Sequence, residues 1–165
     1  MLRSIMIRLP LFVAICGILA AAPRPSVVPP PPPAPPPPPP SRLSFRTAFD
    51  GVAADGVHCL WQGSVDGAAR GTLTLALRQV EDPVAAANPV WHVESHWSVR
   101  DTADGGERSF TADLEGMIDW KAGGVRLAGV ITDGWAKGAW VEVTGRLVAG
   151  DLAGTVTISP ALVRR

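Results

Sequence analysis

The 165-residue chain has no tyrosine and only two cysteines, Cys16 and Cys59. Because Cys59 is the only cysteine beyond residue 42, no internal disulfide can form in the rest of the chain. A domain there must be held together by its own apolar core. Cys59 shares strand parity with Val57 and Trp61, which predicts a buried and unreactive thiol.

The N-terminal apolar run, residues 9–22, is too short to span a membrane as a helix. It is 14 residues long and contains Pro10, whereas a spanning helix needs about 20 apolar residues. Arg3 and Arg8 precede the run. A short apolar run behind positive charges is typical of an export signal, so we assign residues 1–22 to a signal peptide.

Two ways of processing this segment remain open. Small residues predict cleavage after Ala20 or Ala21. Alternatively, residues 13–16 resemble a bacterial lipobox, in which Cys16 would carry the lipid and provide the only membrane attachment. Both predict an extracytoplasmic protein that is secreted, periplasmic or tethered to the envelope.

No excess of charge of one sign is present, with 15 basic and 15 acidic residues. Arg3, Arg8 and Arg24 are the basic residues before Ser41, so twelve basic and all fifteen acidic residues follow it. A domain with a slight negative charge and no basic stripe is a poor partner for nucleic acid. We expect no nucleic-acid partner and no cofactor, and we leave an oligomer open.

Proline is concentrated in one place. Residues 29–40 are all proline except Ala34, which predicts a stiff polyproline II spacer of roughly 37 Å. We therefore assign residues 23–42 to a proline-rich linker and residues 43–165 to one folded domain.

Period-two alternation dominates this domain, and no window favours a long helix. In residues 71–80, for example, Leu73, Leu75 and Leu77 share one face, and Thr72 and Thr74 share the other. Residues 81–89 form a proline-bracketed loop, and residues 104–106 predict a tight hairpin turn. The predicted strands cover residues 43–49, 57–65, 71–80, 90–100, 110–120, 125–131, 139–147 and 152–158.

About eight short antiparallel strands, each with one apolar face, must stack or close to bury those faces. Glycines recur on the apolar rows, where a missing side chain lets a strand bend as barrel closure requires. These are Gly116, Gly129, Gly145 and Gly154. The sequence thus predicts an all-β fold, a small antiparallel barrel of about eight strands, in preference to a sandwich.

One polar cluster has the residue types of a metal site. His92, Glu94 and His96 share a strand face, and neighbours two apart lie about 7 Å from each other. His92 and His96 are about 13 Å apart and cannot both bind one ion. A site would need donors from a neighbouring strand, such as Asp113 or Glu115. The alternate positions are apolar, which favours solvated side chains, so we predict no metal.

The six tryptophans provide the candidate binding residues. Trp135 lies in a connection and Trp140 lies opposite the apolar row of its strand, so exposure of both would suit a glycan or an apolar ligand. Trp135 plugging the barrel end is the alternative. Trp61 and Trp97 lie on apolar faces and are candidates for the wall of an internal site. Thr47, Gln62 and Ser95 are the polar residues expected near the interior.

Two segments resemble the bacterial exported proteins of the allene oxide cyclase and dirigent-like barrel group. They are residues 129–135 (GVITDGW) and 152–158 (LAGTVTI), supported by residues 91–97. The similarity covers about the last 75 residues and implies an eight-stranded barrel with an apolar internal cavity. The absence of tyrosine means that the tyrosine-containing pockets of dirigent proteins are not reproduced, and no cyclase active-site position can be matched.

We therefore expect an exported, non-catalytic barrel that binds a small apolar molecule or a cell-envelope component. One alternative is a cyclase- or isomerase-like enzyme that uses the barrel cavity. The other is a glycan-binding module that presents Trp135 and Trp140 on a rigid spacer. No catalytic residue is assigned.

Overall fold

The computed structural model describes residues 38–80 and 89–160, which form an all-β unit. The predicted signal segment with Cys16, most of the linker and the loop at residues 81–88 lie outside the described residues. No described helix is long and apolar enough to cross a membrane. The strands are β1 (Ser41–Val52), β2 (Cys59–Gly67), β3 (Gly71–Gln79), β4 (Val90–Asp101), β5 (Phe110–Asp119), β6 (Gly124–Gly134), β7 (Trp140–Val148) and β8 (Asp151–Ser159).

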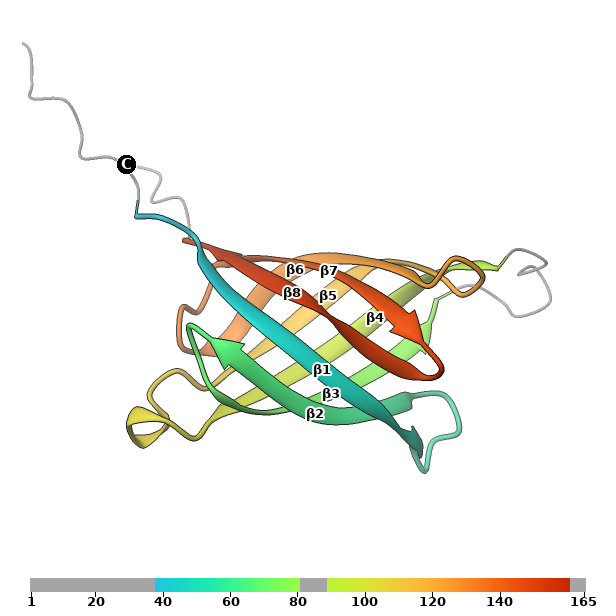
Figure 1. Ribbon diagram of the computed structural model, residues 1–165, viewed down its shortest axis with the longest axis horizontal. Coiled ribbons are helices and arrows are strands. Elements are labelled where there is room, and N and C mark those ends of the chain that lie inside the picture. The colour runs from blue at the N-terminus through green and yellow to red at the C-terminus, as the bar shows by residue number, and fades with distance from the viewer. Residues whose placement is uncertain (1–37, 81–88, 161–165) are drawn as a thin grey trace, which may run out of the picture. The chain divides into compact units, whose positions relative to one another are not determined.

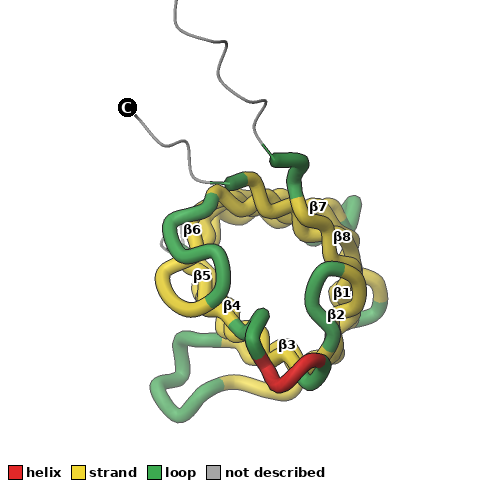
Figure 2. The backbone as a smooth tube through the Cα atoms, turned by 90° about the vertical axis from the view of Figure 1, so that its left-hand side faces the viewer, coloured by secondary structure: helices red, strands yellow, loops and turns green. Residues whose placement is uncertain are grey.

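The eight strands form a closed antiparallel barrel in sequence order (Figures 1 and 2). Each strand pairs with the next, and β1 pairs with β8 from Ser41 opposite Ile158 to Thr47 opposite Leu152. The predicted barrel is therefore confirmed. Closure leaves neither β1 nor β8 with an unpaired edge along this register.

The alternation of each strand sets what lies inside. In β3, Leu73, Leu75 and Leu77 are buried, whereas Thr72 and Thr74 are exposed, as predicted. The middle of the barrel is filled: Phe45 and Trp97 pack edge to face, with ring centroids 5.0 Å apart. Side chains thus occupy the centre, where the resemblance implied a cavity.

Of the three polar residues expected near the interior, two lie there. The Thr47 hydroxyl donates to the Leu152 carbonyl, and the Trp97 indole donates to the Ser95 hydroxyl. The expectation for Gln62 is wrong. It has the parity opposite to that of Trp61, so it is exposed and its amide donates to Asp50 on the outer surface.

Close strand approach explains the inward-facing glycines. A Cβ on Gly129 would come within 2.9 Å of the Leu114 Cα on β5, and a Cβ on Gly154 within 2.5 Å of the Gly145 Cα on β7. Real Cβ atoms do not approach backbone this closely. Glycine at these positions lets neighbouring strands come together as the sheet curls.

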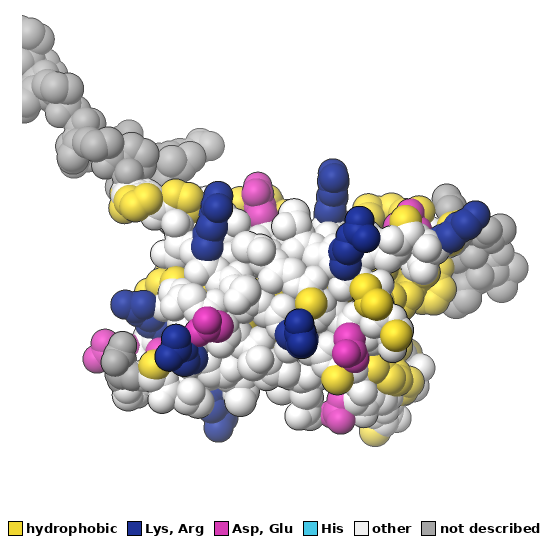
Figure 3. Space-filling model, in the orientation of Figure 1, with side chains coloured by type: hydrophobic (Ala, Val, Ile, Leu, Met, Phe, Trp, Pro, Cys, Tyr) yellow, Lys and Arg dark blue, Asp and Glu magenta, His cyan; other side chains and the backbone are white. Residues whose placement is uncertain are grey.

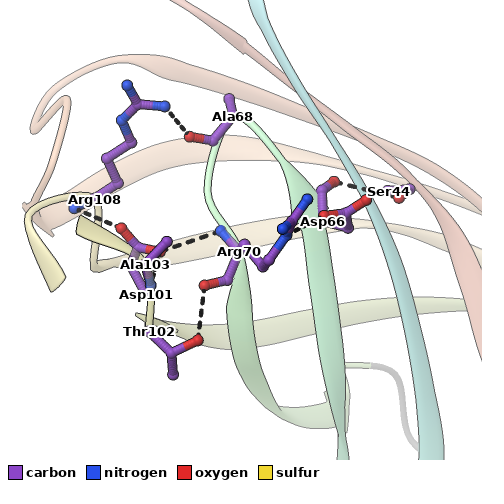
Figure 4. A network of polar contacts seen from close by, with 8 residues as sticks. All are labelled: Ser44, Asp66, Ala68, Arg70, Asp101, Thr102, Ala103 and Arg108. Atoms are coloured by element: carbon purple, nitrogen blue, oxygen red, sulfur yellow. Dashed lines mark hydrogen bonds and ion pairs between the residues drawn. The ribbon is translucent and has the colours of Figure 1, made fainter. Parts of the chain in front are cut away.

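One end of the barrel is closed by connections between strands. The β4–β5 connection is longer than the predicted tight turn, because residues 102–109 include a 3₁₀ turn, η1 (Asp104–Gly106). The buried Asp101 accepts backbone N–H groups of Arg70, Ala103 and Arg108 (Figure 4). The Arg108 guanidinium also donates to the Ala68 carbonyl, which joins this connection to the β2–β3 turn.

These contacts set the charge state of Asp101. Burial by itself raises the pKa of its carboxyl, but the three backbone N–H donors and the nearby Arg108 together lower the pKa below its ordinary value of 3.8. Asp101 is therefore ionised near neutral pH. Its carboxylate ties two connections together across the closed end.

Candidate ligand-binding pocket

The opposite end of the barrel holds an apolar pocket of about 440 Å³. This end carries the β1–β2, β3–β4, β5–β6 and β7–β8 connections, so it is the right-hand end in Figure 1. The chain enters β1 and leaves β8 at the closed end, away from the pocket. The lining residues are Phe49, Cys59, Trp61, Leu77, Gln79, Trp91, Trp120, Leu147, Ala149 and Gly150.

Four of the ten lining residues are aromatic and come from different parts of the barrel. Trp91 on β4 packs edge to face with Trp120 just after β5, at 5.0 Å between ring centroids. Phe49 on β1 packs in the same way with Trp61 on β2, at 5.3 Å. The Trp61 indole donates to the Gly150 carbonyl in the β7–β8 turn at 3.0 Å, which fixes its orientation at the mouth. The wall is therefore a preformed apolar surface.

Two hydrogen-bond donors in this wall have no acceptor. Among the described side chains, the Gln79 amide nitrogen and the Trp120 indole nitrogen are the buried polar atoms without a partner. Both residues line the pocket. Buried polar groups are nearly always hydrogen-bonded, so two such atoms at one pocket need an explanation.

The rim of the pocket carries exposed apolar side chains among charged ones such as Asp50, Asp55 and Lys121. The described chain exposes eight large apolar side chains, and five of them lie at this end. Hydrophobic side chains gather at the right-hand end of the surface shown in Figure 3. The five residues are Phe49, Val52, Val57, Val80 and Val148.

The β1–β2 connection holds part of this rim in place. The Asp55 carboxylate accepts the backbone N–H groups of Val57 and His58 and contacts the His58 ring at 2.6 Å. The backbone N–H of His58, then that of Val57, and the His58 side chain lower the pKa of Asp55 from 3.8 to about 2. The prediction that Val57 belongs to a strand is wrong, because this turn ends only at residue 58 and leaves Val57 exposed.

The four tryptophans singled out from the sequence lie in different places. Trp61 lines the pocket, whereas Trp97 is buried in the filled middle of the barrel. Trp135 is half-buried at the closed end, with its ring 6.1 Å from that of Phe110 and the Arg108 guanidinium over it. Trp140 is 46% exposed on the outer surface, where its indole donates to Glu142. The four residues do not form one site.

Sequence reasoning missed Phe49, Trp91 and Trp120 as pocket residues. Each lies at the end of an apolar row, and those row ends meet at one end of the barrel. The up-and-down order places these row ends at one end of the barrel, but strand stagger decides which side chains there line a pocket. Cys59 is half-buried in the pocket wall, less enclosed than predicted.

On the histidine strand face, each of the three predicted residues contacts a partner of the opposite hydrogen-bonding type. His92 contacts Glu115 at 2.7 Å and His96 contacts Asp113 at 2.6 Å, across the predicted β4–β5 pairing. Glu94 instead accepts the Arg78 guanidinium at 2.9 Å. Within the described residues, no three His, Cys, Asp or Glu side chains are grouped as metal ligands would be.

A wider groove of about 590 Å³ runs over this outer surface. His96, Asp113, Glu115 and Arg78 line it, and Trp140 lies at its side. Its polar side chains already contact partners on this surface and are open to solvent, so each contact contributes little energy. The pocket at the open end combines greater apolarity with unpaired donors, and we take it as the candidate site.

No protein-family model, curated protein or solved structure matches this chain.

Proposed function

We propose that this chain is an exported, non-catalytic binding protein whose barrel takes a small apolar molecule at its open end. The observation that carries the proposal is the difference between the two ends. Charged and backbone hydrogen bonds close one end, whereas the other opens into a pocket walled by aromatic rings. Export rests on the predicted signal segment.

The apolar rim supports the same role. Scattered apolar side chains are normal on a protein surface, but a group of them around a concave site marks a place where an apolar partner binds. A molecule that approaches this end of the barrel meets exposed apolar side chains there, among them Phe49, Val57 and Val148. Removing the apolar surface of the molecule from water favours its entry by about 25 cal/mol for each Å² of apolar area buried.

A cyclase- or isomerase-like enzyme requires an acid or base beside the substrate. Among the described lining residues, Cys59 and Gln79 are the polar or ionisable side chains besides the tryptophan indoles. Neither forms a hydrogen bond to a histidine or carboxylate in the described part of the chain, as an activated nucleophile would. Binding is therefore the proposal, with the enzyme as the alternative implied by the resemblance.

Glycan binding is the second candidate, and one observation favours it. Trp140 is exposed beside the outer groove, with Asp113 and Glu115 in that groove. An exposed indole with nearby carboxylates can stack on a sugar ring and accept its hydroxyl groups. Trp135 does not contribute to this surface, because it lies half-buried against Phe110.

A neutral apolar dye, N-phenylnaphthylamine, tests the proposal. Its fluorescence should rise in an apolar site, and Cys59→Trp should weaken its binding at least tenfold by filling the pocket. Leu60→Trp is the matched control, because Leu60 is the next residue on β2 and faces the outer surface. Equal binding to both variants, or no binding to the unaltered chain, would contradict the proposal.

Soluble polysaccharides test the second candidate separately. If glycans bind at the outer groove, Trp140→Ala should abolish the binding and Cys59→Trp should leave it unchanged. If Cys59→Trp weakens binding of the dye and Trp140→Ala leaves it unchanged, the two ligands bind to different surfaces. Intrinsic tryptophan fluorescence reports both titrations, because indoles lie at each surface.

A further inference from the structure

We infer that the ligand of the open-end pocket is an uncharged molecule that carries a carbonyl oxygen on its apolar body. This inference rests on the proposed function and narrows its ligand class. It starts from the two buried donors without partners, Gln79 Nε2 and Trp120 Nε1. Both belong to side chains that line the same pocket.

The two donors differ from the other buried polar groups of the barrel. Thr47, Ser95 and Asp101 each have a hydrogen-bond partner within the protein. Trp61, in the same pocket wall as Trp120, donates to the Gly150 carbonyl. The described barrel thus satisfies its polar groups elsewhere, and the two nitrogens without partners both belong to residues of the pocket wall.

An acceptor brought by a ligand would satisfy these donors. An amide N–H and an indole N–H donate, and a carbonyl oxygen offers two lone pairs to accept them. Burying a donor without a partner has a large cost, so a ligand that supplies the acceptor gains more than one that only fills space. Both nitrogens are enclosed by protein atoms, so the oxygen meets them only when the Gln79 amide turns about its side-chain torsions and the Trp120 ring shifts.

The pocket lining also limits the charge that the ligand can carry. No charged side chain belongs to the described lining of the pocket. A carboxylate or an ammonium group would lose its hydration there without gaining a counter-ion, which opposes binding strongly. The ligand is therefore neutral, such as a ketone, an ester or an amide.

Pocket size limits the apolar body. Filled at the density of a protein interior, 440 Å³ holds about 330 Å³ of van der Waals volume. A body of fused rings fits this volume and can pack on the Trp91 and Trp120 rings. Three compounds with one shared tricyclic body separate the contributions: fluorene, fluorenone and fluorenecarboxylate.

Displacement of N-phenylnaphthylamine from the full chain measures the three affinities. Fluorenone should bind about three- to tenfold more tightly than fluorene for each donor it satisfies. Fluorenecarboxylate should bind more weakly than both. In ¹⁵N–¹H spectra, the Trp120 indole proton should shift downfield with fluorenone but not with fluorene, and the Trp140 indole proton should not move.

Two variants remove the donors: Gln79→Met keeps the length of the side chain, and Trp120→Phe keeps a smaller aromatic ring in the wall. Trp120→Phe and Gln79→Met should each reduce the preference for fluorenone over fluorene toward equality. Matched controls on the outer surface are Trp140→Phe and Gln62→Met, which remove donors already paired with Glu142 and Asp50. These controls should keep the preference. If Trp120→Phe fails to fold, Gln79→Met and the indole shift decide the question.

The outcomes separate this inference from the proposed function. Equal affinity for fluorene and fluorenone, with the dye still bound in the pocket, overturns the carbonyl inference and leaves the apolar-binding proposal intact. Tightest binding of fluorenecarboxylate also overturns it. If neither the dye nor any tricyclic compound binds, the inference and the proposed function both fail.

Discussion

At the residue scale, Gly154 illustrates how one missing side chain permits the barrel to close. It lies opposite Gly145 on β7 and opposite Phe45 on β1. The Phe45 ring covers both glycines, since added Cβ atoms on them would come within 3.0–3.4 Å of its ring carbons. An aromatic ring over a cross-strand glycine pair supplies the packing that the glycines lack.

Gly154→Ala should therefore destabilise the fold by about 1–3 kcal/mol, because the new Cβ runs into the backbone of β7. Chemical denaturation monitored by tryptophan fluorescence measures this change. Gly124→Ala is the control, since a Cβ there meets nothing within 4 Å, and it should change stability by less than about 0.5 kcal/mol. Equal effects of the two substitutions would refute the close-approach explanation.

At the element scale, the β4–β5 connection closes one end through Asp101. Its carboxylate accepts N–H groups from the β2–β3 turn and from its own connection. The Ser109 hydroxyl also accepts the Asp101 backbone N–H, which ties the end of the connection to the end of β4. One ionised side chain thus joins two connections at this end, beside the Arg108 hydrogen bond to Ala68.

Asp101→Asn should lower the midpoint of thermal unfolding at pH 7 by several degrees, because an amide is a weaker acceptor and directs N–H groups toward the same donors. Asp133→Asn is the control, since Asp133 is exposed and makes only a 3.4 Å contact with Lys137. Calorimetry of both variants and the unaltered chain provides the comparison. An unchanged midpoint for Asp101→Asn would show that the network does not hold the closed end.

The stability difference between the unaltered chain and Asp101→Asn should also depend on pH. The folded pKa of Asp101 lies below 3.8, so its carboxylate adds stability above that pH and loses this contribution as the pH falls through the folded pKa. The stability gap between the unaltered chain and Asp101→Asn should be constant above about pH 5 and shrink below pH 3.8. A gap that widens in acid would give the opposite sign and contradict the assigned pKa direction.

At the scale of the whole molecule, closure between β1 and β8 gives the barrel two unlike ends. The first and last strands pair over seven residue positions, from Ser41 and Ile158 to Thr47 and Leu152. The Thr47 side chain adds a buried hydrogen bond to the Leu152 carbonyl across this seam. Chain entry and exit then share the closed end, and the pocket with its apolar rim takes the other.

Hydrogen exchange tests the pairing of β1 with β8. In a closed barrel, the amides shared between β1 and β8 should be protected to a degree similar to those between β4 and β5, because both exchange through global opening. Mass spectrometry or NMR at neutral pH measures the rates. Rapid exchange along β1 and β8, with slow exchange in β4 and β5, would indicate an open sheet.

The candidate site was less predictable than the fold. The alternation in residues 71–80 or 110–120 by itself assigns each side chain to an inner or outer face of the sheet. It does not reveal which row ends meet. The sequence therefore favoured Trp135 and Trp140 as binding residues and assigned Trp91 and Trp120 to the core. Gln79 gave no signal, because a glutamine at the end of a strand is usually solvated.

By itself, the sequence determined the number of strands, their antiparallel connections and the inward rows, because these follow from a two-residue period and from turn residues close in the chain. Only the tertiary structure decided that β8 seals against β1, that Asp101 closes one end and that Trp61, Trp120 and Gln79 meet at the other. Those outcomes depend on strand stagger and curvature, which arise from packing between residues far apart in the chain and leave no local pattern.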